Sequence, residues 1–310
     1  MTVDALPDRV DGRVSVVVLN WNSGDLGLAA VASVAALDHS DVETIVVDNA
    51  SDDDSLDRIL AAHPDVVVVR NDENLAFARG MNTGIAVATG EFVLPLNCDA
   101  TLDPGYVSTL IDVLRREPRA AAAGGRVESE RVGASGPIEI TSTMRTHGLP
   151  VDAPTVCDKL NGACPVFRGA ALDQVHGMFG GPYDPTYDMY GEDVDLALTL
   201  GRLGWTFHYD PAAVAQHVRS YGTAPKVANR RGRFRVSTLA NRRRNIRRHS
   251  PTPRRTGLLA SVQDAGFAAL RLVRGDVAAP RDVLAAWRRI ASERTSDQEK
   301  RRRLPSPVGR

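Results

Sequence analysis

Short apolar runs alternate with longer stretches rich in alanine and leucine over the first 120 residues, and this alternation constrains the fold most. Runs of four to six apolar residues are typical of buried strands, and they occupy residues 14–19, 44–47, 66–69 and 91–96. Strands that alternate with helices form a parallel sheet covered by helices on both faces. We therefore expect an α/β fold with a mostly parallel central sheet flanked by helices.

The C-terminal third differs in charge from the rest. Residues 219–310 hold 24 Lys and Arg against 6 Asp and Glu, whereas residues 1–218 hold 14 against 32. A basic block of this kind is typical of proteins that bind a phosphate-rich partner, such as nucleic acid, anionic lipid or a diphosphate ligand. It is equally typical of a helical segment whose charges are neutralised by an acidic body, and both interpretations stay open. We expect helices near 232–249, 256–273 and 280–291.

The composition, 43% hydrophobic and 25% charged, is that of an ordinary globular protein. No apolar stretch approaches the roughly 20 residues that a membrane span needs. The three cysteines, an odd number, lack metal-ligand spacing, which fits a reducing compartment. The acidic N-terminal residues do not resemble a secretory signal. We expect a cytoplasmic location.

Two acidic clusters follow predicted strands or begin predicted helices. Asn97 and Asp99 directly follow the run at 91–96, and Glu192 and Asp193 precede an amphipathic stretch. Open α/β sheets bind ligands at the carboxyl ends of their strands, and one or two carboxylates with substrate phosphates are the usual way to recruit Mg²⁺. A second carboxylate set nearby is then available to remove a proton. These features indicate metal-assisted group transfer from a phosphorylated donor.

Seven short motifs, in order, resemble those of the family 2 glycosyltransferases of the GT-A fold. They cover about residues 13–220. Within this family the chain resembles bacterial rhamnosyltransferase-like members, although this subgroup signal is weaker than the family signal. The matching segments are 16–23, 46–52, 74–82, 97–100, 161–164, 191–196 and 217–220. The resemblance implies transfer of a sugar from a nucleoside-diphosphate donor, with inversion, as in polysaccharide or cell-wall biosynthesis.

The resemblance also implies a domain organisation. After a lead at 1–12, residues 13–118 form the nucleotide-sugar half and residues 119–220 the acceptor half, with 128–158 as an irregular insertion. Residues 221–295 form the basic helical extension, and 296–310 are expected to be disordered.

Four residues are expected to bind the donor nucleotide, which we expect to be UDP or dTDP. Asp48 would accept a hydrogen bond from the N3–H of the base, rather than only cap the following helix. Leu19 and Trp21 would flank the base, although a plain core role is as plausible for Trp21. Asn82 would contact the ribose or diphosphate, or only brace its loop.

Asp99 and His217 are the metal ligands that the resemblance implies, for Mn²⁺ or Mg²⁺. The family's metal motif is Asp-x-Asp-like, and here Asn97 replaces the first acid. Because an amide is a weaker ligand than a carboxylate, we expect Asn97 to contact the donor or a metal-bound water.

Glu192 and Asp193 lie in the motif that supplies the family's catalytic base. An inverting transferase needs one base opposite the leaving group, and we favour Asp193 over Glu192. The alternative role is stabilisation of a helix N-terminus by acidic side chains. Asp195 is expected to be structural.

The expected acceptor is a glycan or a lipid-linked sugar. Arginines 242–244 and 247–248, with the apolar residues 258–260 and 267–270, would then rest on anionic lipid at the inner membrane face. We thus expect residues 230–270 to make a peripheral contact with an anionic membrane, and we expect no nucleic acid as a partner. The alternatives are a nucleic-acid-binding protein that acts through the basic block, and a nucleotidyltransferase, which would usually show a glycine-rich basic loop after the first strand.

Overall fold

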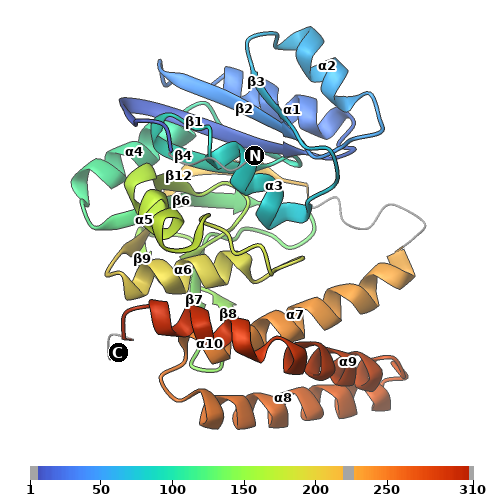
Figure 1. The fold of residues 1–310 in the computed structure, drawn as a ribbon. Helices are drawn as coiled ribbons and strands as arrows, with labels where there is room; N and C mark the ends of the chain where they lie inside the picture. The colour runs from blue at the N-terminus through green and yellow to red at the C-terminus, as the bar shows by residue number, and fades with distance from the viewer. Residues whose placement is uncertain (1–5, 219–226, 307–310) are drawn as a thin grey trace. The chain divides into compact units, whose positions relative to one another are not determined.

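The computed structural model describes residues 6–218 and 227–306 (Figure 1). The chain forms two compact units. The first comprises Met1–Glu139, Gly148–Pro185 and Gly204–Ser220, and the second Ile140–His147, Thr186–Leu203 and Tyr221–Arg310. The division into a nucleotide-sugar half and an acceptor half stays a prediction.

The first unit is built on a nine-stranded sheet with the order β3-β2-β1-β4-β11-β6-β12-β5, in which β9 also pairs with β12. Strands β3, β2, β1 and β4 are parallel, as are β6 and β12, whereas β5, β9 and β11 run antiparallel to their neighbours. The strands are β1 Val10–Asn20, β2 Val42–Asp48, β3 Val67–Arg70, β4 Gly90–Asn97, β5 Ala100–Leu102, β6 Ala120–Glu128, β9 Thr155–Cys157, β11 Val166–Arg168 and β12 Thr206–His217.

Helices cover both faces of this sheet, because alternate strand residues point to opposite sides. Val16, Val18 and Val46 belong to one core cluster with residues of α1, α2 and α4, whereas Val17 and Val47 face α3. The expected α/β fold with a central parallel sheet is therefore confirmed. The helices of the unit are α1 Asp25–Ala35, α2 Ser55–Ala62, α3 Ala76–Ile85, α4 Tyr106–Arg116 and α5 Gly169–Phe179.

The chain after β4 departs from the expectation in three places. Strand β5 was not expected. The sequence predicts two strands at 205–209 and 214–218, on either side of Pro211, whereas the structure has the single strand β12. The register of β12 on β6 shifts between Tyr209 and Val214, and such an irregularity accommodates a proline. The segment 128–158 is not irregular throughout. It contains β7 Pro137–Ile140, which pairs with β10 Lys159–Leu160, and β8 Thr146–Gly148.

The second unit is helical. Three of its helices lie where the sequence predicts them, but the tail expected to be disordered from residue 296 instead continues as a helix, with Asp297 and Lys300 buried. The end at 307–310 and the motif residues Arg219 and Ser220 lie outside the described residues. The helices are α6 Glu192–Arg202, α7 Val227–His249, α8 Pro253–Val273, α9 Ala279–Ser292 and α10 Arg294–Arg303.

Five arginines in the C-terminal half of α7 are neutralised inside this unit. Arg244 and Arg248 are each 1% exposed. Asp264 pairs with two arginines, and Asp297 and Glu293 pair with others. The arginine partners are Arg242, Arg243, Arg244, Arg247 and Arg248. The expectation that these arginines rest on lipid is therefore wrong, because their charges are neutralised by Asp264 of α8, Asp297 of α10 and Glu293, which joins α9 to α10.

Among the described residues, no helix is both long enough and apolar enough to cross a bilayer.

Candidate active site

The turn after β4 brings Asp99 next to His217. Strand β4 ends at Asn97, the chain reverses at Cys98 and Asp99, and β5 pairs antiparallel with β12, so that Ala100 lies opposite His217. The backbone N–H of Val218 donates to the Asp99 carbonyl at 3.0 Å. His217 Nε2 lies 2.9 Å from Asp99 Oδ1. A three-residue strand thus joins two side chains that are 118 positions apart in the chain.

These two side chains fit a divalent cation as neighbouring ligands. Two ligands at about 2.1 Å from an octahedral ion lie roughly 3 Å apart, close to the observed separation of the Asp99 and His217 atoms. Among the described residues, those of this site included, there is no group of three or more His, Cys, Asp or Glu side chains that could hold a metal ion. The remaining ligands would therefore come from the substrate and water. Burial and the charge of Asp99 raise the pKa of Cys98 to about 12.

Asp48 ends strand β2, which is separated from β4 by β1, at the same edge of the sheet. It is buried, and the Asn20 side chain of β1 donates to its Oδ1 at 3.1 Å. Helix α2 begins beyond Asp54, and its first N–H, that of Ser55, donates to Asp53. Among the described residues Asp48 caps no helix. Its position is compatible with binding a ligand at the strand end.

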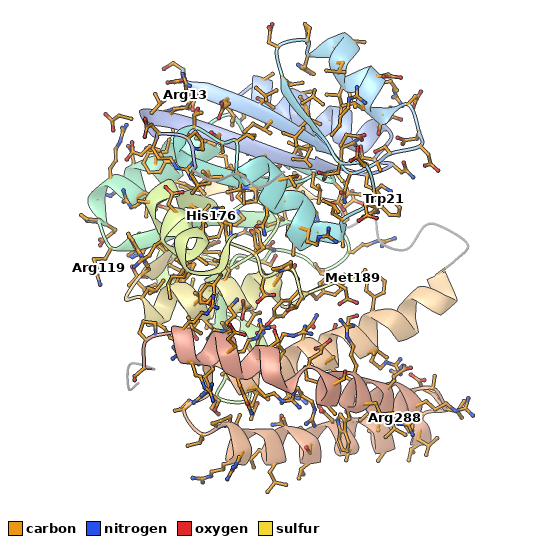
Figure 2. All side chains as sticks on the ribbon, in the orientation of Figure 1. Arg13, Trp21, Arg119, His176, Met189 and Arg288 are labelled. Carbon is orange, nitrogen blue, oxygen red and sulfur yellow. The ribbon has the colours of Figure 1, made fainter. Side chains whose placement is uncertain are left out.

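Trp21 follows β1 and is 47% exposed, so the plain core role is wrong for it. Figure 2 labels this side chain beyond the end of the strand. Leu19 is half-buried beside α3, where a Cβ at Gly80 would lie only 2.9 Å from Leu19 Cδ1. Gly80 in the 74–82 motif thus permits the close approach of α3 to the ends of β1 and β2.

Asn82 binds the protein's own backbone. Its amide nitrogen donates to the Tyr183 carbonyl at 2.7 Å, and its amide oxygen accepts from the Tyr183 N–H at 3.0 Å. This pair of bonds favours the bracing role over contact with a ribose or diphosphate. Asn97 differs, since its backbone N–H donates to Ala163 but its half-buried side chain forms no hydrogen bond with any other described residue.

Two buried asparagines at this edge were missed in the sequence. Asn20 donates to Asp48 and also to Ser55 at 3.0 Å. Asn49 accepts from the Leu75 N–H at 3.0 Å and donates to Asn74, which holds the loop before α3 against the end of β2. The signal that identified Asp48, a polar residue at the end of an apolar run, applies equally to these two.

Glu192 and Asp193 begin α6 in the second unit. Gly191 precedes them with φ 92°, a conformation that favours glycine. Glu192 is buried, and Asp193 is half-buried with its Oδ1 accepting from the Val194 N–H at 2.8 Å. Both acids occupy the first turn, where the helix dipole stabilises negative charge.

Asp195 has the structural role expected for it. It is 1% exposed and accepts from Lys300 Nζ at 2.6 Å and from His249 at 2.8 Å. Burial opposes its charge, but Lys300 and His249 hold the pKa of this carboxyl well below its usual range. The pair anchors α6 to α7 and α10.

The sequence-based candidates therefore fall into two groups. Asp99 and His217 are in contact, and Asp48, Asn97 and Trp21 lie at or just beyond the carboxyl ends of β2, β4 and β1. Glu192 and Asp193 form the second group, at the start of α6 in the other unit.

Comparison with known proteins identifies the family. The family model "Glycosyl transferase family 2" matches residues 15–171, half of the chain. The chain is 27% identical over 248 residues to an N-acetylglucosaminyl-diphospho-decaprenol L-rhamnosyltransferase of Mycobacterium tuberculosis, which covers 69% of this chain and 78% of that protein. It is 24% identical over 213 residues to a poly-beta-1,6-N-acetyl-D-glucosamine synthase of Staphylococcus aureus, with 67% of this chain and 50% of that protein covered.

A solved structure shows the same fold. It is a mannosyltransferase from Pyrobaculum calidifontis in complex with GDP-Man and Mn²⁺, with a TM-score of 0.54, 19% identity, and 95% of this chain and 90% of that chain covered. Together with the match of the family model, the parallel sheet and its polar edge lead to one conclusion: the chain belongs to the family 2 glycosyltransferases and is a glycosyltransferase.

Proposed function

We propose that the protein transfers a sugar from a UDP or dTDP donor to a hydroxyl of a glycan or lipid-linked acceptor. The transfer inverts the configuration at the anomeric carbon, and rhamnose is the first sugar to test. The observation that carries the proposal is the contact of Asp99 with His217 at the edge where β1, β2 and β4 end. The rhamnosyltransferase of M. tuberculosis supports the sugar and the lipid-linked acceptor, since its name states both.

The donor nucleotide would bind at the ends of β1 and β2. Asp48, oriented by Asn20, would accept from the N3–H of the uracil or thymine ring. The exposed ring of Trp21 is available to pack on the base, and Leu19 would contact it from the same strand. A base without an N3–H donor lacks this hydrogen bond, which favours UDP and dTDP over CDP.

Asp99 and His217 would hold a divalent cation, Mn²⁺ or Mg²⁺, between the protein and the diphosphate. When bound, such an ion neutralises charge that develops on the leaving nucleoside diphosphate. Asn97 would contact the donor through its half-buried amide. The complex of the Pyrobaculum mannosyltransferase with GDP-Man and Mn²⁺ supports a divalent cation.

Asp193 would act as the base. It would take the proton of the acceptor hydroxyl while that oxygen bonds to the anomeric carbon from the side opposite the diphosphate. The bond between the anomeric carbon and the diphosphate oxygen breaks in the same step, and the configuration inverts. Its position in the first turn of α6 puts the carboxylate at the positive end of the helix dipole.

A thermal-shift panel of UDP-, dTDP-, GDP- and CDP-sugars, each with Mn²⁺ or with chelator, tests the donor class. A ligand that binds only the folded state raises the melting temperature. We expect stabilisation by UDP- or dTDP-sugars that is lost with chelator and in Trp21→Ala. Stabilisation by GDP-sugars alone, or by no nucleotide, would contradict the proposed donor.

The alternative of nucleic-acid binding loses the support of arginines 242–244, 247 and 248. The described arginines of α7 are engaged by acids of the same unit, so they do not present a continuous cationic surface. The nucleotidyltransferase alternative is excluded by membership of the glycosyltransferase family.

A further inference from the structure

Helix α8 has the reverse of the usual amphipathic arrangement. A surface helix normally buries its apolar stripe and exposes its polar residues. Here the buried positions are small or ionic: Thr256, Ala260, Asp264 and Ala268. The exposed positions are large and apolar: Leu258, Leu259, Val262, Leu270, Leu272 and Val273. These six residues are called the apolar face of α8 below.

Exposed apolar side chains are concentrated on this part of the second unit. Of the fifteen large apolar side chains that are exposed in the described chain, eight lie between Leu258 and Leu284. Helix α8 packs against α7 and α9, and Figure 1 shows both on the same side of it. The apolar face is therefore turned away from its own helical neighbours, and a contiguous patch of this kind marks an interaction site.

The charges around the apolar face have one sign. Three acids occur between residues 253 and 292, and each is engaged by arginine. They are Asp264, paired with Arg242 and Arg243, Asp276, paired with Arg235 and Arg271, and Asp282, paired with Arg235. Five exposed arginines form no ion pair with a described residue: Arg254, Arg255, Arg274, Arg281 and Arg288, the last labelled in Figure 2.

We propose that the apolar face of α8 lies on an anionic lipid surface, parallel to the membrane plane. Arg254 and Arg255 begin the helix and Arg274 follows its end, so both ends of the face carry cations that can reach phosphate headgroups. The helix is about 30 Å long. An apolar face with flanking arginines is the pattern of interfacial helices, whose binding grows with buried apolar area and with anionic lipid. Arginines 242–244, 247 and 248 of α7 take no part, because acids of the same unit pair with them.

A second copy of the chain is a poorer partner for the same face. Antiparallel pairing of two α8 helices places Arg254 and Arg255 against Arg274 of the other copy. Parallel pairing places each arginine against its own equivalent. Both arrangements bring like charges together with no unpaired acid on α8 to compensate in the described chain, whereas anionic headgroups satisfy them.

Vesicle co-sedimentation of the full chain tests this proposal, with phosphatidylcholine alone and with phosphatidylcholine mixed with phosphatidylglycerol. We expect binding only to the mixed vesicles. Val262→Asp should weaken that binding by about tenfold or more, because it puts a charge on the apolar face. Val156→Asp on β9 is the matched control, since Val262 and Val156 are 65% and 63% exposed, and it should leave binding unchanged.

The arginines are tested with a second matched pair of variants. Each basic residue near an anionic surface contributes about fivefold to binding, so Arg254→Glu with Arg255→Glu should weaken binding by about 25-fold or more. Arg115→Glu with Arg116→Glu, an exposed pair at the end of α4, should have little effect. Hydrogen exchange should slow within Pro253–Val273 when mixed vesicles are added.

Three results would overturn the proposal: no binding to mixed vesicles, equal binding of Val262→Asp and Val156→Asp, or exchange protection confined to other segments. If the protein instead dimerises and Val262→Asp dissociates the dimer, the face belongs to a second copy. These experiments use neither donor nor acceptor, so their failure would leave the proposed sugar transfer standing.

Discussion

His217 Nε2 and Asp99 Oδ1 lie 2.9 Å apart, although the two residues are 118 positions apart in the chain. The contact depends on β5, which reverses the chain directly after Asp99 and pairs it with the end of β12. An acid and an imidazole from two different strands thus meet at the edge where the parallel strands end. The account of metal-assisted transfer depends on this pair.

Asp193→Asn should leave donor binding intact while turnover falls by about 10²-fold or more, as is usual when a general base is lost. Glu192→Gln, one residue earlier in the same helical turn, is the control and should lower turnover much less. Donor titration measures the donor affinity of both variants, and initial rates measure their turnover. Normal turnover in Asp193→Asn would transfer the role of base to another residue.

Gly84→Ala should destabilise the first unit. A Cβ at Gly84 would overlap methyl groups of Val17 and Val47, where α3 packs on β1 and β2. Overpacking of this kind costs about 1–3 kcal/mol. Gly257→Ala in α8 is the control, because nothing lies within 4 Å of its added Cβ, and alanine is the better helix former by about 1 kcal/mol. Denaturant unfolding that shows equal effects for both would contradict the packing described.

Lys300→Met should destabilise the second unit by about 3 kcal/mol. It leaves the buried carboxylate of Asp195 without the cation at 2.6 Å, and breaking a buried pair is costly. Arg302→Met, exposed on the same helix, should change the free energy of unfolding by less than about 0.5 kcal/mol. If both variants have the same melting temperature as the wild type, α10 does not anchor α6.

Stability should fall as the pH drops below about 6.5, the ordinary pKa of histidine. Burial lowers the pKa of His249 in the folded protein. Between the folded and unfolded pKa values, the unfolded chain binds the proton more strongly, so acidification favours unfolding. Asp195, whose pKa is also lowered, loses its stabilising contribution only at still lower pH, below its ordinary pKa of 3.8. His249→Gln should flatten the pH dependence near 6.5. An unchanged profile would contradict the role of His249.

The sequence predicts the parallel half of the sheet well, because its strands are continuous apolar runs such as that ending at Asp48. It does not predict β5, whose three residues carry no periodic signal. It also fails for the tail, because the partners of Asp195 are not apparent from spacing. Lys300 is 105 residues away, and only the folded helical unit brings them together.

The proposed role of Asp99 and His217 in metal-dependent donor binding is tested by titrating UDP- or dTDP-rhamnose into four proteins, each with and without Mn²⁺. They are the wild type, Asp99→Asn, His217→Ala and the control Asp103→Asn. Asp103 is exposed just beyond β5 and lies outside the proposed site. The account predicts Mn²⁺-dependent binding in the wild type and Asp103→Asn, its loss in Asp99→Asn and its weakening in His217→Ala. Equal Mn²⁺-dependent binding by all four proteins would contradict it.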